Sequence, residues 1–64
     1  MQQQGVTVTV ELSEGEALAL AQLVKRMGFS DARQLAASDE EAYAMLDAIH
    51  RVQHGLAVAG FAPR

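Results

Sequence analysis

The chain has 64 residues, a mass of 6.9 kDa and a formal net charge of −3 at pH 7. At this length the hydrophobic burial of one small domain about equals the entropic cost of ordering the chain. The sequence therefore predicts a marginally stable monomer, or a protein that gains further burial from a second copy or a partner. It contains no cysteine, which excludes disulfides and thiolate metal sites.

Residues 1–5 are predicted to be a flexible N-terminus, and residues 6–12 to form a strand. In this segment Val6, Val8 and Val10 alternate with polar residues, and strict period-two alternation is typical of a half-buried strand with the valines inward. A lone strand leaves its backbone groups unpaired. It therefore needs a mate: the same strand of a second copy, residues 57–63 folding back, or a partner protein.

A first helix is predicted over about 14–27. Ser13 and Glu16 are spaced as a capping box, in which each side chain bonds the backbone N–H of the other residue. Apolar residues then recur at helical spacing. Gly28 is expected to end the helix in a left-handed conformation.

Two further helices are predicted over about 31–37 and 39–59. Ser38 and the three acidic residues after it read as a second capping box, which separates these two helices. Gly60 is expected to close the last helix, with Phe61 folding back on it. The predicted fold is one α+β domain, mostly helical, in the order β-α-α-α.

The sequence favours a non-enzymatic protein without cofactors. His50 and His54 are four residues apart, so both rings could face one metal ion, but no third ligand follows at a recognisable spacing. The acidic residues stand mainly in the first turns of helices, where the helix dipole favours the ionised form rather than a general acid. No glycine-rich loop suited to phosphate is present.

No apolar run approaches the ~20 residues that span a bilayer. The N-terminus also lacks the basic and apolar regions of a secretory signal. We therefore expect a cytoplasmic protein without membrane contact.

The acidic residues are unevenly distributed. Residues 1–47 contain all eight acidic residues and three basic ones, a net charge of −5, whereas residues 48–64 contain two arginines and no acid. Solvated helix faces are one explanation, and an acidic surface that attracts a basic partner is the other; a nucleic-acid-binding protein normally shows the opposite balance. The residues predicted to contact such a partner are Glu11, Glu14, Asp31, Asp39, Glu40, Glu41 and Asp47.

The stretch from Val6 to Ala17 and the segment from Lys25 to Ser30 resemble the ribbon-helix-helix repressors and antitoxins. This resemblance implies a homodimer joined by paired strands, with Thr7, Thr9 and Glu11 reading DNA bases. The chain departs from that pattern, because its ribbon has no Lys or Arg and phosphate would repel Glu11.

A second resemblance rests on residues 16–21, 25–31, 41–45 and 59–64. Through these segments the sequence is similar, over nearly its whole length, to small phage and mobile-element proteins that include anti-CRISPR inhibitors of type I effector complexes. That similarity implies a monomeric or homodimeric inhibitor that mimics DNA and occupies a basic DNA-binding site on an effector in the bacterial host cytoplasm, without binding nucleic acid itself. The alternatives are a ribbon-helix-helix-like regulator or antitoxin, and a module that caps a partner's sheet edge.

Overall fold

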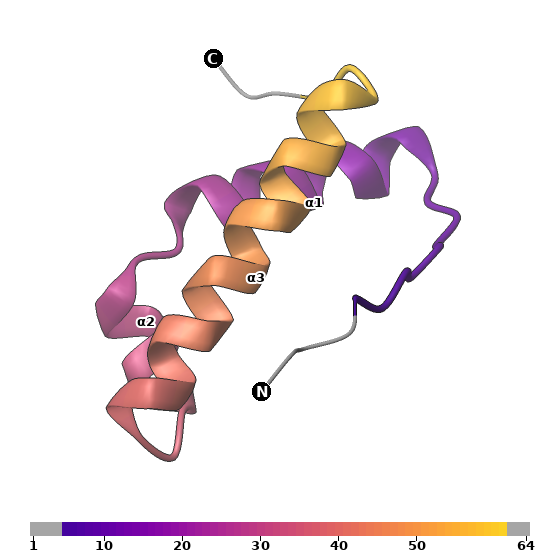
Figure 1. Ribbon diagram of the computed structural model, residues 1–64. Coiled ribbons are helices and arrows are strands. Elements are labelled where there is room, and N and C mark those ends of the chain that lie inside the picture. Colours follow the sequence, from indigo (N-terminus) through magenta and orange to yellow (C-terminus); the bar gives the residue numbers. More distant parts are fainter. Residues whose placement is uncertain (1–4, 62–64) are drawn as a thin grey trace.

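The computed structural model describes residues 5–61, which contain three helices. These are α1 (Glu14–Arg26), α2 (Phe29–Leu35) and α3 (Asp39–Val58). The long helix α3 packs against both of the others. Figure 1 shows α2 beside the first turns of α3, while α1 crosses α3 nearer to its C-terminal end.

Within residues 5–61 the structure contains no strand, so the predicted α+β fold with a strand over 6–12 is wrong. Figure 1 shows the segment running as an extended chain, as its alternating pattern indicates, but its valines are exposed rather than half-buried. A strand exists only when its backbone bonds to a neighbour, and residues 57 and 58 belong to α3 rather than folding back onto the segment. The predicted flexibility of residues 1–4 lies outside the described residues.

The start of α1 confirms the predicted capping box. The Ser13 hydroxyl accepts from the Glu16 N–H at 3.1 Å, and the Glu16 carboxylate accepts from the Ser13 N–H at 2.9 Å. The end of the helix differs from the prediction, because Gly28 has φ −122° and ψ −174° and is therefore not left-handed. Its extended conformation instead leads directly into α2.

The second helix begins at Phe29, two residues before the predicted start. The carboxylate of Asp31 accepts from the Gly28 N–H at 2.8 Å and so satisfies a donor just before the first turn. The helix ends at Leu35, after seven residues.

The third helix has a modified cap at its start. The Ser38 hydroxyl accepts from the Glu41 N–H at 3.2 Å, as predicted, but the Glu41 carboxylate accepts from the Ala37 N–H at 2.8 Å instead of returning to Ser38. At the other end Gly60 has φ 98°. Its N–H donates to the Ala57 carbonyl at 3.0 Å, and the Phe61 N–H donates to the Leu56 carbonyl at 2.7 Å. This bond pair is a Schellman motif, which confirms the predicted C-terminal stop.

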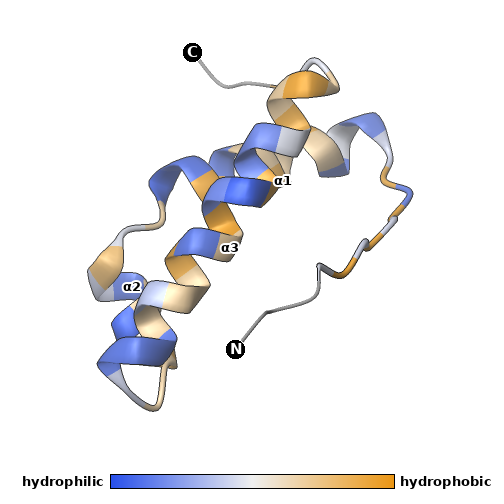
Figure 2. Ribbon diagram, viewed as in Figure 1, coloured by the Kyte–Doolittle hydropathy of each residue, from blue (hydrophilic) through white to orange (hydrophobic). Residues whose placement is uncertain are grey.

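The interior of this small protein is built from small side chains. The buried apolar residues include four alanines, and none of the described large side chains is fully buried. Larger apolar residues of α3 are half-buried around them, and the Phe29 and Tyr43 rings contact each other with centroids 4.9 Å apart. Figure 2 shows apolar stretches alternating with polar ones along the helices and along the N-terminal segment. The buried residues are Ala17, Ala21, Val24, Ala32 and Ala42.

Candidate binding surface

All eight acidic side chains are exposed, including the seven that the sequence analysis assigns to partner contact. Most stand at helix starts, where the unpaired backbone N–H groups and the helix dipole stabilise negative charge. Exposure keeps a carboxylate accessible to a partner, but it does not show whether that carboxylate is already engaged within the chain. The hydrogen bonds and ion pairs of each acidic side chain show which carboxylates are engaged within the chain and which are not.

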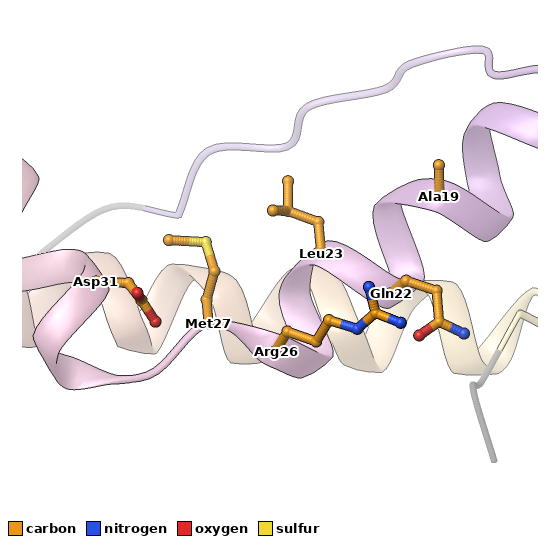
Figure 3. A pocket seen from close by; sticks show the side chains of 6 residues that line it. All are labelled: Ala19, Gln22, Leu23, Arg26, Met27 and Asp31. Carbon is orange, nitrogen blue, oxygen red and sulfur yellow. The ribbon is translucent and has the colours of Figure 1, made fainter.

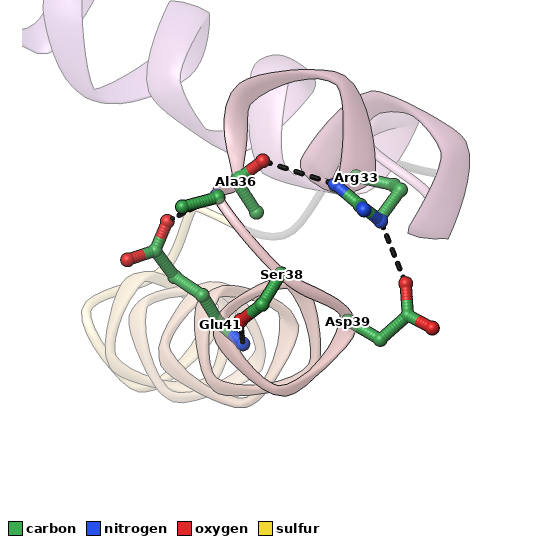
Figure 4. Close-up of polar contacts among 6 residues, drawn as sticks. Arg33, Ala36, Ser38, Asp39 and Glu41 are labelled. Carbon is green, nitrogen blue, oxygen red and sulfur yellow. Dashed lines mark hydrogen bonds and ion pairs between the residues drawn. The ribbon is translucent and has the colours of Figure 1, made fainter.

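One carboxylate is neutralised at the turn between α2 and α3. Arg33 donates from Nε to Oδ1 of Asp39 at 2.6 Å and from Nη1 to the Ala36 carbonyl at 3.0 Å. Figure 4 shows this guanidinium bridging the end of α2 and the start of α3. Because both side chains of the ion pair are well exposed, the pair contributes at most about 1 kcal/mol to stability. Asp39 therefore helps to hold the turn between α2 and α3, in addition to being a candidate for partner binding.

Three further carboxylates belong to helix caps. Glu16, Asp31 and Glu41 each accept from a backbone N–H at a helix start. Hydrogen bonds with the backbone and then the side chain of Ser13 hold the pKa of Glu16 below its usual range. These groups keep their negative charge, but part of their hydrogen-bonding capacity is used inside the protein.

The remaining predicted acids are Glu11, Glu14, Glu40 and Asp47. Within residues 5–61 none of the four takes part in a hydrogen bond or an ion pair. Glu40 and Asp47 are seven residues apart on α3. Two helical turns separate them, so they project from nearly the same face about 10 Å apart along the axis.

The structure divides the predicted acidic surface into two parts. Glu11, Glu14 and Glu16 lie around the start of α1, whereas Asp39, Glu40 and Glu41 lie at the start of α3. Figure 1 shows these two helix starts at opposite ends of the molecule. Asp31 is in the first turn of α2, the helix that lies beside the start of α3. The seven residues therefore form two separate groups rather than one continuous patch.

Next to Asp47, the outer face of α3 also contains basic and imidazole groups. Asp47, His50, Arg51 and His54 line a shallow hollow there. Among the described residues no group of three or more metal-ligating side chains is placed to hold a metal ion. The sequence already places Arg51 on the same side of this helix as Glu40 and Asp47, because it follows Asp47 by four residues.

A second hollow lies on the outer side of α1. Its lining includes Leu23 and Arg26 of α1, Met27 just after the helix, and the neighbouring Asp31, and its volume is about 470 Å³. Figure 3 shows the side chains spread over an open surface, with Leu23 and Met27 on the side where the N-terminal segment passes. A volume of this size suits a small ligand only when the walls enclose it, and these walls do not.

Among the helices of residues 5–61, none combines the length and the apolar character that a membrane-spanning helix requires. Comparison with known proteins gives no match among curated proteins and none among solved structures. One family matches the entire sequence, from residue 1 to residue 64, and it is described as a family of unknown function. The chain therefore belongs to that family, DUF7706.

Proposed function

We propose that this protein is a small non-enzymatic binding protein that contacts a basic surface of a partner through the acidic face of α3. The observation that carries the proposal is the pair Glu40 and Asp47. Both carboxylates are exposed, both project from nearly the same face, and neither has a partner within residues 5–61. Their charge is therefore available to a cationic groove without first breaking a contact inside the protein.

The chemistry of this face suits a partner that normally binds nucleic acid. Duplex DNA presents closely spaced negative charges, and proteins bind them with Lys and Arg. A rigid helix with carboxylates two turns apart on nearly the same face can present negative charge to the same side chains. The uneven charge of the chain would also attract such a partner over a distance, at a rate that falls as salt screens the charges.

We propose a type I CRISPR effector complex with a basic DNA-binding site as the first partner to test, because the sequence resembles the anti-CRISPR proteins. In this proposal the protein acts by DNA mimicry and binds stoichiometrically. The readout is the effector's affinity for its target DNA, measured with and without an excess of the protein. We expect the protein to weaken DNA binding by the effector and to have no affinity for DNA itself.

The decisive variant is Glu40→Lys with Asp47→Lys. Because neither carboxylate caps a helix, the double variant should keep its helical circular dichroism while its affinity for the partner falls by at least about tenfold. The matched control is Glu40→Gln with Asp47→Asn, which removes both charges without reversing them and should give a smaller loss.

Two results would contradict the proposal. Full inhibition by the lysine variant would show that these carboxylates do not contact the partner. A shift of duplex DNA by the protein alone, in a gel at moderate salt, would instead support direct DNA binding, as in the ribbon-helix-helix alternative.

A further inference from the structure

We propose that the extended segment 6–12 is a strap that closes over an apolar stripe on the outer side of α1 in the same chain. The stripe consists of Ala19 and Leu23 of α1 and Met27 just after the helix. The Ala19 side chain is exposed, Leu23 is 54% exposed and Met27 is half-buried. The stripe therefore offers an apolar surface that α2 and α3 leave largely uncovered.

The strap offers a matching apolar side. Val6, Val8 and Val10 are 83%, 76% and 68% exposed, and they alternate with polar residues. Alternate side chains of an extended segment point to the same side, so the three valines share one side of the strap. Within residues 5–61 the backbone of the strap forms no hydrogen bond with another backbone group. The strap can therefore move without breaking a backbone hydrogen bond.

The strap and the stripe lie on the same side of α1. In Figure 3 the side chains of Ala19, Leu23 and Met27 point toward the side along which the N-terminal segment passes. Figure 1 shows this segment turning back at the start of α1. The three stripe residues also line the open hollow of about 470 Å³ described above. A closed strap therefore covers this hollow with its valines.

The strap has the length to cover the whole stripe. Strap and helix meet at Ser13, the residue that caps α1. The seven residues of the strap span about 23 Å when extended. The rise along the helix from Ser13 to Met27 is about 21 Å, because the Met27 N–H still donates to the Leu23 carbonyl at 3.1 Å and so continues the helical spacing. A strap folded back along α1 therefore ends where the stripe ends.

The spacing of the apolar residues also matches. Successive valines are about 6.6 Å apart along an extended strap, and successive stripe residues are about 6 Å apart along the helix. By the same measure Val8 lies about 17 Å before Ser13, and Leu23 lies about 15 Å after it. Folding back at Ser13 therefore brings the valines into register with the stripe. The expected pairs are Val10 with Ala19, Val8 with Leu23, and Val6 with Met27.

Closure of the strap requires no β-strand. An extended segment that packs on a helix forms no ladder of backbone bonds, and its backbone groups stay hydrated along its edges. Thr7 and Thr9 then face water, on the side away from the valines. The gain from covering apolar surface is opposed by the entropy of ordering the strap, which is of similar size. The strap therefore closes reversibly, and the structure shows its open form.

The first test is a cross-link within the full chain, which has no cysteine of its own. Val8→Cys with Leu23→Cys joins a strap position to its expected contact, and glutathione disulfide serves as the oxidant. The matched control is Thr9→Cys with Leu23→Cys, in which the first thiol is on the other side of the strap. An unstructured tether would bring both thiols to position 23 equally often. We therefore expect the Val8 pair to form its disulfide at least about fivefold faster.

The second test uses the sulfur atom of Met27. Hydrogen peroxide oxidises an accessible methionine to the sulfoxide, and mass spectrometry after digestion follows the reaction at Met27 alone. Val6→Gln with Val8→Gln should raise its rate of oxidation at least about twofold, because a strap that is closed half of the time hides the sulfur for half of the time. The matched control, Thr7→Gln with Thr9→Gln, changes the outward side of the strap and should leave the rate unchanged.

Three results would overturn the proposal. Equal rates of cross-linking for the Val8 and Thr9 pairs would show an unstructured tether, and an unchanged oxidation rate of Met27 would show that the strap does not cover the stripe. Disulfides that join two chains in dilute solution, seen as a doubled mass, would assign the valines to a second copy instead. Circular dichroism of each variant verifies that the helices are intact. None of these results bears on Glu40 or Asp47, so failure here is distinct from failure of the proposed function.

Discussion

Ser38 fixes the start of the longest helix. Its hydroxyl accepts from the Glu41 N–H, and the Glu41 carboxylate then takes the N–H of Ala37. The spacing of Ser38 and Glu41 was sufficient to predict the hydroxyl bond, since that bond is local. It could not predict the displaced carboxylate bond, which depends on the path of the turn between α2 and α3.

Removing the hydroxyl with Ser38→Ala should lower the free energy of unfolding by about 0.5–2 kcal/mol, because an N–H at the start of α3 loses its acceptor. Urea unfolding followed by helical circular dichroism measures the change. Ser30→Ala is the matched control, since no hydrogen bond of the Ser30 hydroxyl is found in the described part of the chain. An equal loss in both variants would show that the Ser38 cap is not the cause.

Glu16 gives the stability a defined pH dependence. Because its pKa is lower in the folded protein than in the unfolded chain, its stabilising contribution is present above the ordinary pKa of a glutamate, near 4.3. The contribution is lost as the pH falls through the lower, folded value. We therefore expect the wild type to be more stable than Glu16→Gln at neutral pH.

The difference between these two proteins should shrink as the pH falls below about 4. Thermal unfolding at a series of pH values measures it. Glu14→Gln serves as the control, because Glu14 is a neighbouring exposed carboxylate that does not bond Ser13. A constant difference between wild type and Glu16→Gln across the pH range would contradict the role of the ionised cap.

At the scale of elements, the helices were largely predictable and the N-terminal segment was not. The predicted 14–27, 31–37 and 39–59 compare with Glu14–Arg26, Phe29–Leu35 and Asp39–Val58 in the structure. Caps and apolar spacing act within a few residues, so the sequence displays them directly. A strand depends on a partner segment distant in sequence or in another chain, and alternation of valines indicates only an extended backbone.

Two glycines of the α3 region should respond in opposite directions to alanine. Gly55 is inside the helix with open space around its Cα, so Gly55→Ala should raise the free energy of unfolding by about 0.5–1 kcal/mol. Gly60 has φ 98°, so Gly60→Ala should lower it by about 1–2 kcal/mol through backbone strain. Chemical denaturation of both variants measures the two changes. Two changes of the same sign would contradict the assigned roles of these glycines.

At the scale of the whole molecule, the sequence analysis found the acidic residues but not their arrangement. Their positions at helix starts follow from local rules, whereas their division between the two ends of the molecule follows from how α1 crosses α3. The ion pair of Arg33 with Asp39 was also outside the prediction, because it depends on the short turn that brings α2 back to α3. Tertiary geometry therefore set Asp39 apart from the other predicted residues, whereas the common face of Glu40 and Asp47 follows from their seven-residue spacing on α3.

The alanine-rich interior has a consequence for how much the molecule can bind at one time. Small side chains let the helices pack closely, and the molecule has principal dimensions of 34 × 28 × 17 Å. The shortest dimension is only about one and a half helix diameters. So flat a molecule has almost no interior and two broad faces. A partner bound to one face therefore need not displace a partner bound to the other.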